Sequence, residues 1–206
     1  PKPFDTSIGK TFVSTTCPAF FNLFLDDPDY INCLPLSAML QNSKSFFDIT
    51  KKSGFATTRV LDVACNVNYT KCAAKMEYYG REIKTPERCG TEFGRRDPLV
   101  IQAYASFISY PSLLKAGCLK SDSGSYCYVD AVTNVTSPDD PNIYFLPLGL
   151  KLPSGSRPTC SSCAQETMRI FQKYAGNASL PLSETYVPAA QQLNMECGPQ
   201  FVNTSV

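Results

Sequence analysis

The spacing of apolar residues along the chain predicts a mainly helical protein. The clearest helix lies in residues 71–83, where four apolar residues recur at the interval that places them on one helical face. These four are Cys72, Met76, Tyr79 and Ile83. Similar stripes predict helices in residues 19–25, 36–47, 58–64, 159–174 and 184–197. Asp97-Pro98 reads as an N-cap followed by a first-turn proline, and Pro111 is expected to end the helix that begins there.

Two later segments have the composition of strands. Residues 126–132 and 143–146 are rich in aromatic and β-branched side chains, and residues 137–141 between them are dense in turn formers. This pattern predicts a β-hairpin that packs on the helices, because two strands alone are marginally stable. The expected fold class is therefore mainly α, a disulfide-stapled helical domain over residues 1–206 with a small β-hairpin. Residues 1–16 are polar without a period and are expected to form a surface arm.

The cysteines change the picture most, because the chain of 206 residues holds ten of them and no histidine. An even number of cysteines predicts a disulfide framework formed outside the reducing cytosol. Local spacing favours a Cys118–Cys127 bridge, whereas Cys160 and Cys163 share a predicted helix and are expected to bond to partners elsewhere. Metal ligation and redox chemistry are the alternatives, and they lack the second close pair or the preceding strand that they need. The candidate half-cystines are Cys17, Cys33, Cys65, Cys72, Cys89, Cys118, Cys127, Cys160, Cys163 and Cys197.

Four N-glycosylation sequons indicate the same compartment. They begin at Asn68, Asn134, Asn177 and Asn203. No apolar run reaches the length of a membrane helix and no signal peptide precedes the chain, so we expect a mature or trimmed product. The net charge of +1 gives no field that would attract nucleic acid. The expected location is secreted, or the extracellular face of the plasma membrane or cell wall.

Candidate chemistry is sparse. Without histidine there is no Ser-His-Asp triad and no imidazole metal site, so we predict no catalytic residue, no metal site and no cofactor. The aspartates at 26, 27 and 29 and at 139 and 140 lie beside prolines and are interpreted as helix caps and turn formers. Calcium ligation and catalysis by a carboxylate pair are the alternatives. The tyrosines supply a candidate ligand groove, with core packing as the alternative. The groove residues are Tyr78, Tyr79, Tyr104, Tyr110, Tyr128 and Tyr144.

Several stretches of the chain resemble an uncharacterised family of secreted fungal proteins. They are residues 17–21 (CPAFF) with 33–37 (CLPLS), 97–104 (DPLVIQAY), 144–149 (YFLPLG), 158–163 (PTCSSC) with 167–168, and 197–202 (CGPQFV). Members of that family usually carry a signal peptide before this span, and many carry a serine-rich tail and a GPI-attachment signal after it. The resemblance therefore implies a cell-surface protein and brings no activity with it. In style alone, the chain also resembles the cysteine-rich ectodomains of the folate-receptor and Frizzled kind.

The leading hypothesis is a non-enzymatic, extracellular, cell-surface-anchored binding or structural module of a fungus. Its partner would be a small apolar molecule, a glycan or a surface protein, with membrane contact only through a lipid anchor outside this chain. A secreted carboxylate-dependent hydrolase and an accessory ectodomain of a membrane complex are the alternatives. A deep cleft with two carboxyl groups would favour the hydrolase, an aromatic groove without buried acids the binder, and a large exposed apolar patch the accessory ectodomain.

Overall fold

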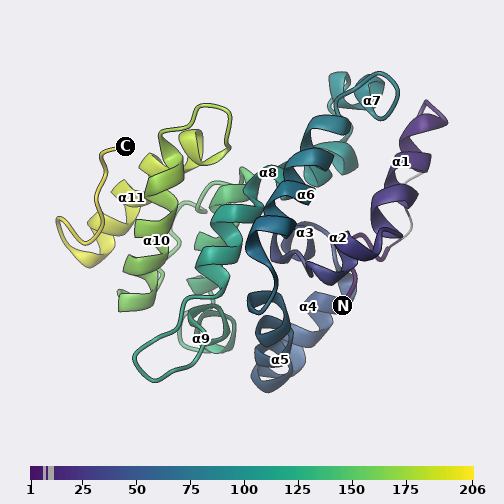
Figure 1. The fold of residues 1–206 in the computed structure, drawn as a ribbon. Helices are drawn as coiled ribbons and strands as arrows, with labels where there is room; N and C mark the ends of the chain where they lie inside the picture. The colour runs from purple at the N-terminus through teal and green to yellow at the C-terminus, as the bar shows by residue number, and fades with distance from the viewer. Residues whose placement is uncertain (7, 9–11) are drawn as a thin grey trace.

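The computed structural model describes residues 1–6, 8 and 12–206, and within that part every regular element is a helix (Figure 1). The elements in chain order are α1 (Thr16–Leu25), α2 (Pro28–Asn32), α3 (Leu36–Gln41), α4 (Lys44–Lys52), α5 (Gly54–Cys65), α6 (Tyr69–Glu82), α7 (Gly90–Gly94), α8 (Pro98–Gly117), α9 (Cys127–Thr133), the 3₁₀ helix η1 (Asp140–Leu148), α10 (Ser162–Ala175) and α11 (Leu182–Cys197).

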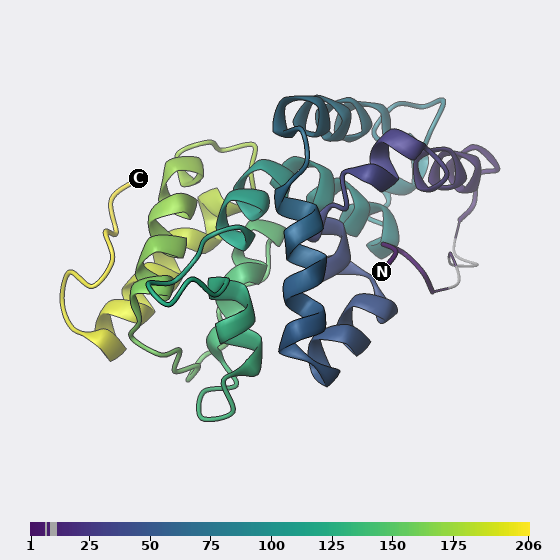
Figure 2. The ribbon, with the colours of Figure 1, turned by 60° about the horizontal axis from the view of Figure 1, so that its bottom comes forward.

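Helix α8 is the central element, and it packs against α3, α6, η1 and α10. Figures 1 and 2 show α1 to α7 gathered on one side of the molecule and α10 with α11 on the other. The buried side chains form two clusters. The amino-terminal core is built from residues between Phe4 and Leu114, mainly on α1, α2, α6 and α8. The central core combines residues from α3, α4, α5 and the end of α8 with residues of α9, η1, α10 and α11.

The predicted helices are confirmed where the apolar stripe and a cap agree. Three residues of the predicted stripe are buried on α6, and the fourth, Ile83, is buried at the C-cap of the helix. Helix α8 begins as expected, because the Asp97 side chain accepts hydrogen bonds from the backbone N–H groups of Leu99 and Val100. The predicted break at Pro111 is wrong, since α8 continues to Gly117. A proline inside a helix costs about 3 kcal/mol, and here Tyr110 and Leu113 on either side of it are fully buried and offset that cost.

The predicted β-hairpin is also wrong. Residues 126–132 form most of α9 and residues 143–146 belong to η1. Their aromatic and β-branched side chains serve the central core, where Tyr128, Val129 and Ile143 are buried. Aromatic and β-branched side chains can be buried from a helix as well as from a strand, so the composition of a short apolar segment does not distinguish the two. Within η1, Pro147 has no N–H group to give to a strand ladder.

All ten cysteines form disulfides, as predicted, and five bonds result. The expected Cys118–Cys127 bond is wrong. The turn between these residues is instead closed by backbone hydrogen bonds, such as the one from the Cys127 N–H to the Leu119 carbonyl. Cys160 and Cys163 do bond to distant partners, as predicted. The pairs are Cys17–Cys89, Cys33–Cys72, Cys65–Cys118, Cys127–Cys163 and Cys160–Cys197.

This pairing divides the chain into two covalently closed units. Three disulfides lie wholly within residues 17–118 and two lie wholly within residues 127–197. Residues 119–126 form the single connection between the units, since no disulfide spans that loop. The units are otherwise held together by the central core, which draws side chains from both.

The predicted surface arm, residues 1–16, includes Ser7, Gly9, Lys10 and Thr11, which lie outside the described residues. The described part of it is attached to the helices at several places. Asp5 accepts hydrogen bonds from the backbone N–H groups of Lys44 and Ser45 at the start of α4, at 2.7 and 2.8 Å. Phe4 is buried in the amino-terminal core. Further along, Glu92 of α7 accepts hydrogen bonds from the backbone N–H groups of Val13 and Ser14 at 3.1 and 2.8 Å.

Glu92 is a buried carboxylate that depends on those contacts. Burial alone would raise the pKa of its side chain, but the hydrogen bonds from Ser14 and Val13 outweigh it and hold the pKa below its usual value. The charged form of Glu92 therefore ties the chain before α1 to helix α7.

Candidate functional site

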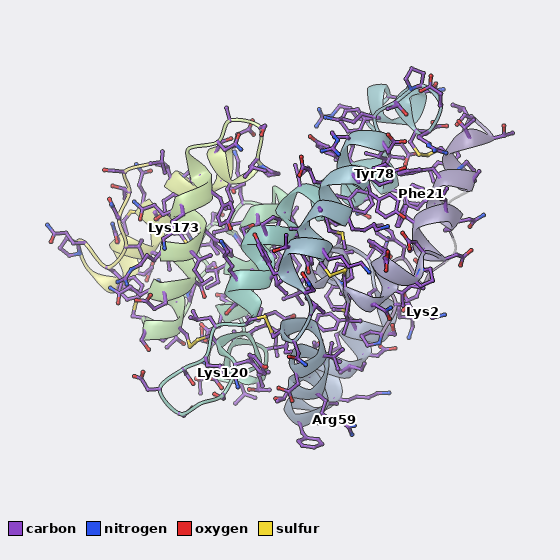
Figure 3. All side chains as sticks on the ribbon, viewed as in Figure 1. Lys2, Phe21, Arg59, Tyr78, Lys120 and Lys173 are labelled. Carbon is purple, nitrogen blue, oxygen red and sulfur yellow. A yellow bond between two sulfur atoms is a disulfide. The ribbon has the colours of Figure 1, made fainter. Side chains whose placement is uncertain are left out.

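The six tyrosines predicted to line a groove do not meet in one place. Tyr79 and Tyr110 are buried in the amino-terminal core, and Tyr128 and Tyr144 in the central core. Burial raises the pKa of all four hydroxyls well above the ordinary tyrosine value. Tyr78 on α6 (labelled in Figure 3) is exposed. Only Tyr104 combines partial exposure with a position in the wall of a large cleft.

Among the aspartates interpreted as helix caps and turn formers, Asp27 acts as predicted. Asp27 caps α2 by accepting a hydrogen bond from the Asp29 backbone N–H at 2.8 Å, and it also meets Lys75 at 3.0 Å and the Tyr79 hydroxyl. Burial would raise the pKa of Asp27, but the hydrogen bonds from Tyr79 and Lys75 keep it below its usual value. This cluster joins α2 to α6 beside the Cys33–Cys72 disulfide.

Asp139 and Asp140 fasten the loop before α10 to the start of η1. Asp139 accepts a hydrogen bond from the Arg157 backbone N–H at 3.0 Å, and Asp140 accepts one from the Thr159 N–H at 2.5 Å. Asp140 also lines a cavity of about 390 Å³ between α9 and α10, together with Asp130. The second oxygen of Asp140 accepts a hydrogen bond from the Asn134 amide at 2.7 Å. Both oxygens of Asp140 are therefore engaged by the loop.

The four sequons lie in two kinds of setting. Asn68, Asn177 and Asn203 are exposed. Asn134 is half-buried, and its amide nitrogen donates to both Asp140 and the Thr159 hydroxyl. A glycan on Asn134 would occupy that nitrogen, so attachment there competes with the loop contacts, whereas the other three positions carry no such conflict.

A cavity of about 700 Å³ forms an open cleft between helix α8 and the carboxy-terminal unit. We call it the α8 cleft. One wall comes from α7 and the first half of α8, and the other from η1, residues 149–150 and the connection between α10 and α11. Apolar side chains dominate the lining, and they include Phe93, Ile101, Tyr104, Ile108, Phe145 and Leu150.

The aromatic side chains at one end of the α8 cleft are held in a defined geometry. The rings of Phe93 and Tyr104 meet edge to face with centroids 5.0 Å apart. The Lys84 ammonium lies 5.1 Å from the centre of the Tyr104 ring, within cation–π range. Arg96 lines the same cleft from the turn after α7, and Glu184 lines it from the first turn of α11.

Sequence reasoning missed most of this site. Of the predicted groove residues, it named Tyr104 alone among those that line the cleft. Phe93, Phe145 and Leu150 carry no local motif, because the cleft exists only once the two covalent units have packed together. The stretch from Tyr144 to Gly149, which supported the family resemblance, contributes Phe145, Leu148 and Gly149 to the lining.

Within the described residues, no helix has the length and apolar character needed to cross a bilayer. The same residues contain no group of three or more cysteine, aspartate or glutamate side chains arranged to hold a metal ion.

The fold and the site together define a class of protein, an all-helical domain stapled by five disulfides with an open, mainly apolar cleft on its surface. The chain belongs to the family described as a domain of unknown function, DUF7729, which matches it over residues 1–206. An uncharacterised family thus covers the whole chain, as the resemblance implied. Neither the curated proteins nor the solved structures include a significant match to it.

Proposed function

We propose that this chain is the binding module of an extracellular, non-enzymatic fungal protein, held at the cell surface by a lipid anchor outside the chain. The α8 cleft is its binding site, and a small apolar molecule is the ligand. The observation that carries this proposal is the size and lining of the cleft. At about 700 Å³ it has the volume that drug-sized ligands occupy, and apolar side chains with a few polar groups at the rim surround it.

The disulfides support the extracellular part of the proposal. Five bonds with no free thiol are typical of proteins that fold in an oxidising compartment and work outside the cell. The three exposed sequons are compatible with glycan attachment in that compartment. The fungal source and the lipid anchor rest on the family resemblance alone.

The hydrolase alternative gains less support. The carboxylates that share the cavity between α9 and α10 are Asp130 and Asp140. Both oxygens of Asp130 lie within hydrogen-bond distance of the Ser125 hydroxyl, which donates its single proton to this carboxylate, and Asp140 holds Thr159 and Asn134 in place. Both carboxylates are engaged in hydrogen bonds that hold loops in place, so a structural role explains them. The apolar α8 cleft has no such structural explanation, and this favours it as the binding site.

Uptake of N-phenyl-1-naphthylamine, a neutral dye that fluoresces in apolar surroundings, tests the binding site. Leu150→Glu places a charge in the α8 cleft at a side chain that is 53% exposed, and Ile31→Glu does the same on α2, away from the cleft, at 48% exposure. We expect saturable binding to the wild-type protein, a loss of about tenfold in affinity in Leu150→Glu, and no change in Ile31→Glu. Absence of saturable binding, or equal losses in both variants, would refute the proposal.

The cell-surface part is tested separately on the protein in its native host. Intact cells are treated with a phospholipase C that is specific for phosphatidylinositol, and the medium is probed with an antibody to the chain. Release by the phospholipase supports a GPI anchor. Retention of the protein inside the cell would contradict the proposed location.

A further inference from the structure

We infer that the ligand of the α8 cleft is an amphipathic anion, with its apolar chain along the cleft and its anionic head at Arg96. This inference rests on the proposed function, because it names the chemical class of the molecule that the cleft takes. Three observations carry it: the backbone of Arg96, the unpaired cations Arg96 and Lys84, and the mainly apolar lining of the cleft.

Arg96 occupies a backbone position that disfavours it. Its φ of 56° lies in the left-handed region, where the turn after α7 is closed by a hydrogen bond from the Arg96 N–H to the Phe93 carbonyl. Glycine or asparagine usually fills such a position after a helix, and another residue costs about 1–2 kcal/mol. Strain of this kind is typical of functional positions, and here it places a long cationic side chain at the wall of the cleft.

Arg96 in the cleft wall and Lys84 over the Tyr104 ring have no carboxylate ion-pair partner among the described residues. Among the described residues, neither Arg96 nor Lys84 has an acidic group within the 4.0 Å of an ion pair, whereas nearby Arg88 pairs with Glu82 at 3.4 Å. Arg96 is exposed, so its guanidinium is free to meet a ligand. A guanidinium presents a planar fork of donors that matches a carboxylate or a phosphate.

The other charged group in the lining sets the orientation. Glu184 lies in the first turn of α11 and lines the cleft. An anionic head is therefore repelled by Glu184 and attracted to Arg96. The rest of the lining is mainly apolar and includes Ile101, Ile108 and Phe145. A single alkyl chain with one anionic head satisfies both the charges and the lining.

The test compares three ligands that share one chain length: dodecanoate, dodecyl phosphate and dodecanol, each below its micellar concentration. Displacement of the neutral dye gives the three affinities. We expect both anions to bind the wild-type protein at least tenfold more tightly than dodecanol, and the preferred head group tells a carboxylate from a phosphate ligand.

Two variants of Arg96 and one matched control assign the preference to this side chain. Arg96→Gly should bring the anions to the affinity of dodecanol, leave dodecanol unchanged, and raise Tm by about 2–4 °C because glycine tolerates the left-handed backbone. Arg96→Gln keeps the backbone cost and should lose the same preference. Arg95→Gly removes a neighbouring charge that does not line the cleft and should leave the preference intact.

The outcomes separate this inference from the proposed function. Equal binding of dodecanol and both anions by the wild-type protein overturns the inference and leaves an apolar binding site in place. Anion preference that survives in both Arg96 variants also overturns it. Binding of none of the three, together with no uptake of the dye, refutes the inference and the proposed function alike.

Discussion

Cutting the chain inside the loop of residues 119–126 should separate it into two pieces under denaturing conditions even though every disulfide stays intact. The loop lies between Cys118 and Cys127, and no disulfide spans it. Lys120 stands at its start (Figure 3), and the residues from Asp122 to Gly124 are exposed. A recognition site for a specific protease can therefore be inserted after Asp122 without disturbing a buried side chain.

The cut should leave the native protein assembled. A short linker holds two pieces at an effective concentration of about 1 mM for each other. At 1 µM protein, cutting the linker therefore lowers the concentration that drives their association by a factor of about 10³, which corresponds to roughly 4 kcal/mol of association free energy. Against this, six side chains of the first unit that are larger than alanine are at most 2% exposed within the central core: Leu36, Met39, Leu40, Phe46, Leu61 and Leu113. Complete burial of six such side chains contributes roughly 9–18 kcal/mol, and half of that burial lying against the second unit is enough to exceed the cost of the cut. The cut protein should elute with intact protein in size exclusion, and its Tm should fall with dilution.

The assay is a denaturing gel run without reductant, and its matched control carries the same protease site in the loop of residues 153–157. That loop is largely exposed, but the Cys127–Cys163 disulfide spans it. Cleavage in residues 119–126 should yield two bands, whereas cleavage in the control should yield one band until reductant is added. A single band from the first protein would mean that a disulfide crosses the loop and that the pairing described here is incorrect.

Three further predictions concern single side chains, each measured by urea unfolding. Glu92→Ala should lower the free energy of unfolding by about 2 kcal/mol at pH 7, and Glu92→Gln, which keeps a hydrogen-bond acceptor, should lower it by less. The pKa of Glu92 in the native protein lies below its usual 4.5. The difference between wild-type and Glu92→Ala should therefore be fully present above pH 4.5 and should shrink as the pH falls through the native pKa. Gly117→Ala should lower the free energy of unfolding by about 1–3 kcal/mol, because its Cβ would lie 2.3 Å from the Leu36 side chain. In the control variant Gly94→Ala the Cβ meets no atom within 4 Å, so the free energy of unfolding should stay the same or rise. In unglycosylated protein, Asn134→Ala should cost about 1–2 kcal/mol through its lost loop contacts, and a comparable effect of Asn203→Ala would contradict that reasoning.

Helices were predictable where two local signals agreed. In α6 the apolar stripe coincides with the Asn68 cap, whose side chain accepts a hydrogen bond from the Lys71 N–H. In α8 the Asp97 cap and Pro98 mark the start. Both signals act within one or two turns of the chain, so they are legible without knowledge of the rest of the fold.

The end of α8 and the nature of α9 and η1 were not predictable, because distant packing decides them. Pro111 is tolerated since the helix around it is buried against α3 and α6, which are remote in sequence. Tyr128 and Tyr144 belong to segments with strand-like composition, yet their rings meet edge to face at 5.0 Å from two helices in the central core. Local propensity is a weak prior, and tertiary burial overrides it.

The disulfide pairing failed for a related reason. Cys118 and Cys127 are near in sequence, but Cys118 ends α8 beside the end of α5, where Cys65 lies, and Cys127 starts α9 facing α10. Five bonds among ten cysteines leave hundreds of possible pairings, and only the relative placement of the helices selects among them. That five bonds would form was predictable from the count, whereas their partners were not.

The α8 cleft was the feature least predictable from the sequence, because each of its walls is formed by a different covalent unit. Phe93 and Arg96 come from the first unit and Phe145 and Leu150 from the second, so no window of sequence contains the site. The clue that the chain did carry is Arg96 itself. An adjacent arginine pair reads as a solvated surface, and only the left-handed backbone of the second arginine shows that a side chain is retained where glycine would cost less. A binding site built this way depends on the central core that joins the two units, so variants that loosen that core should weaken ligand binding before they unfold the amino-terminal core.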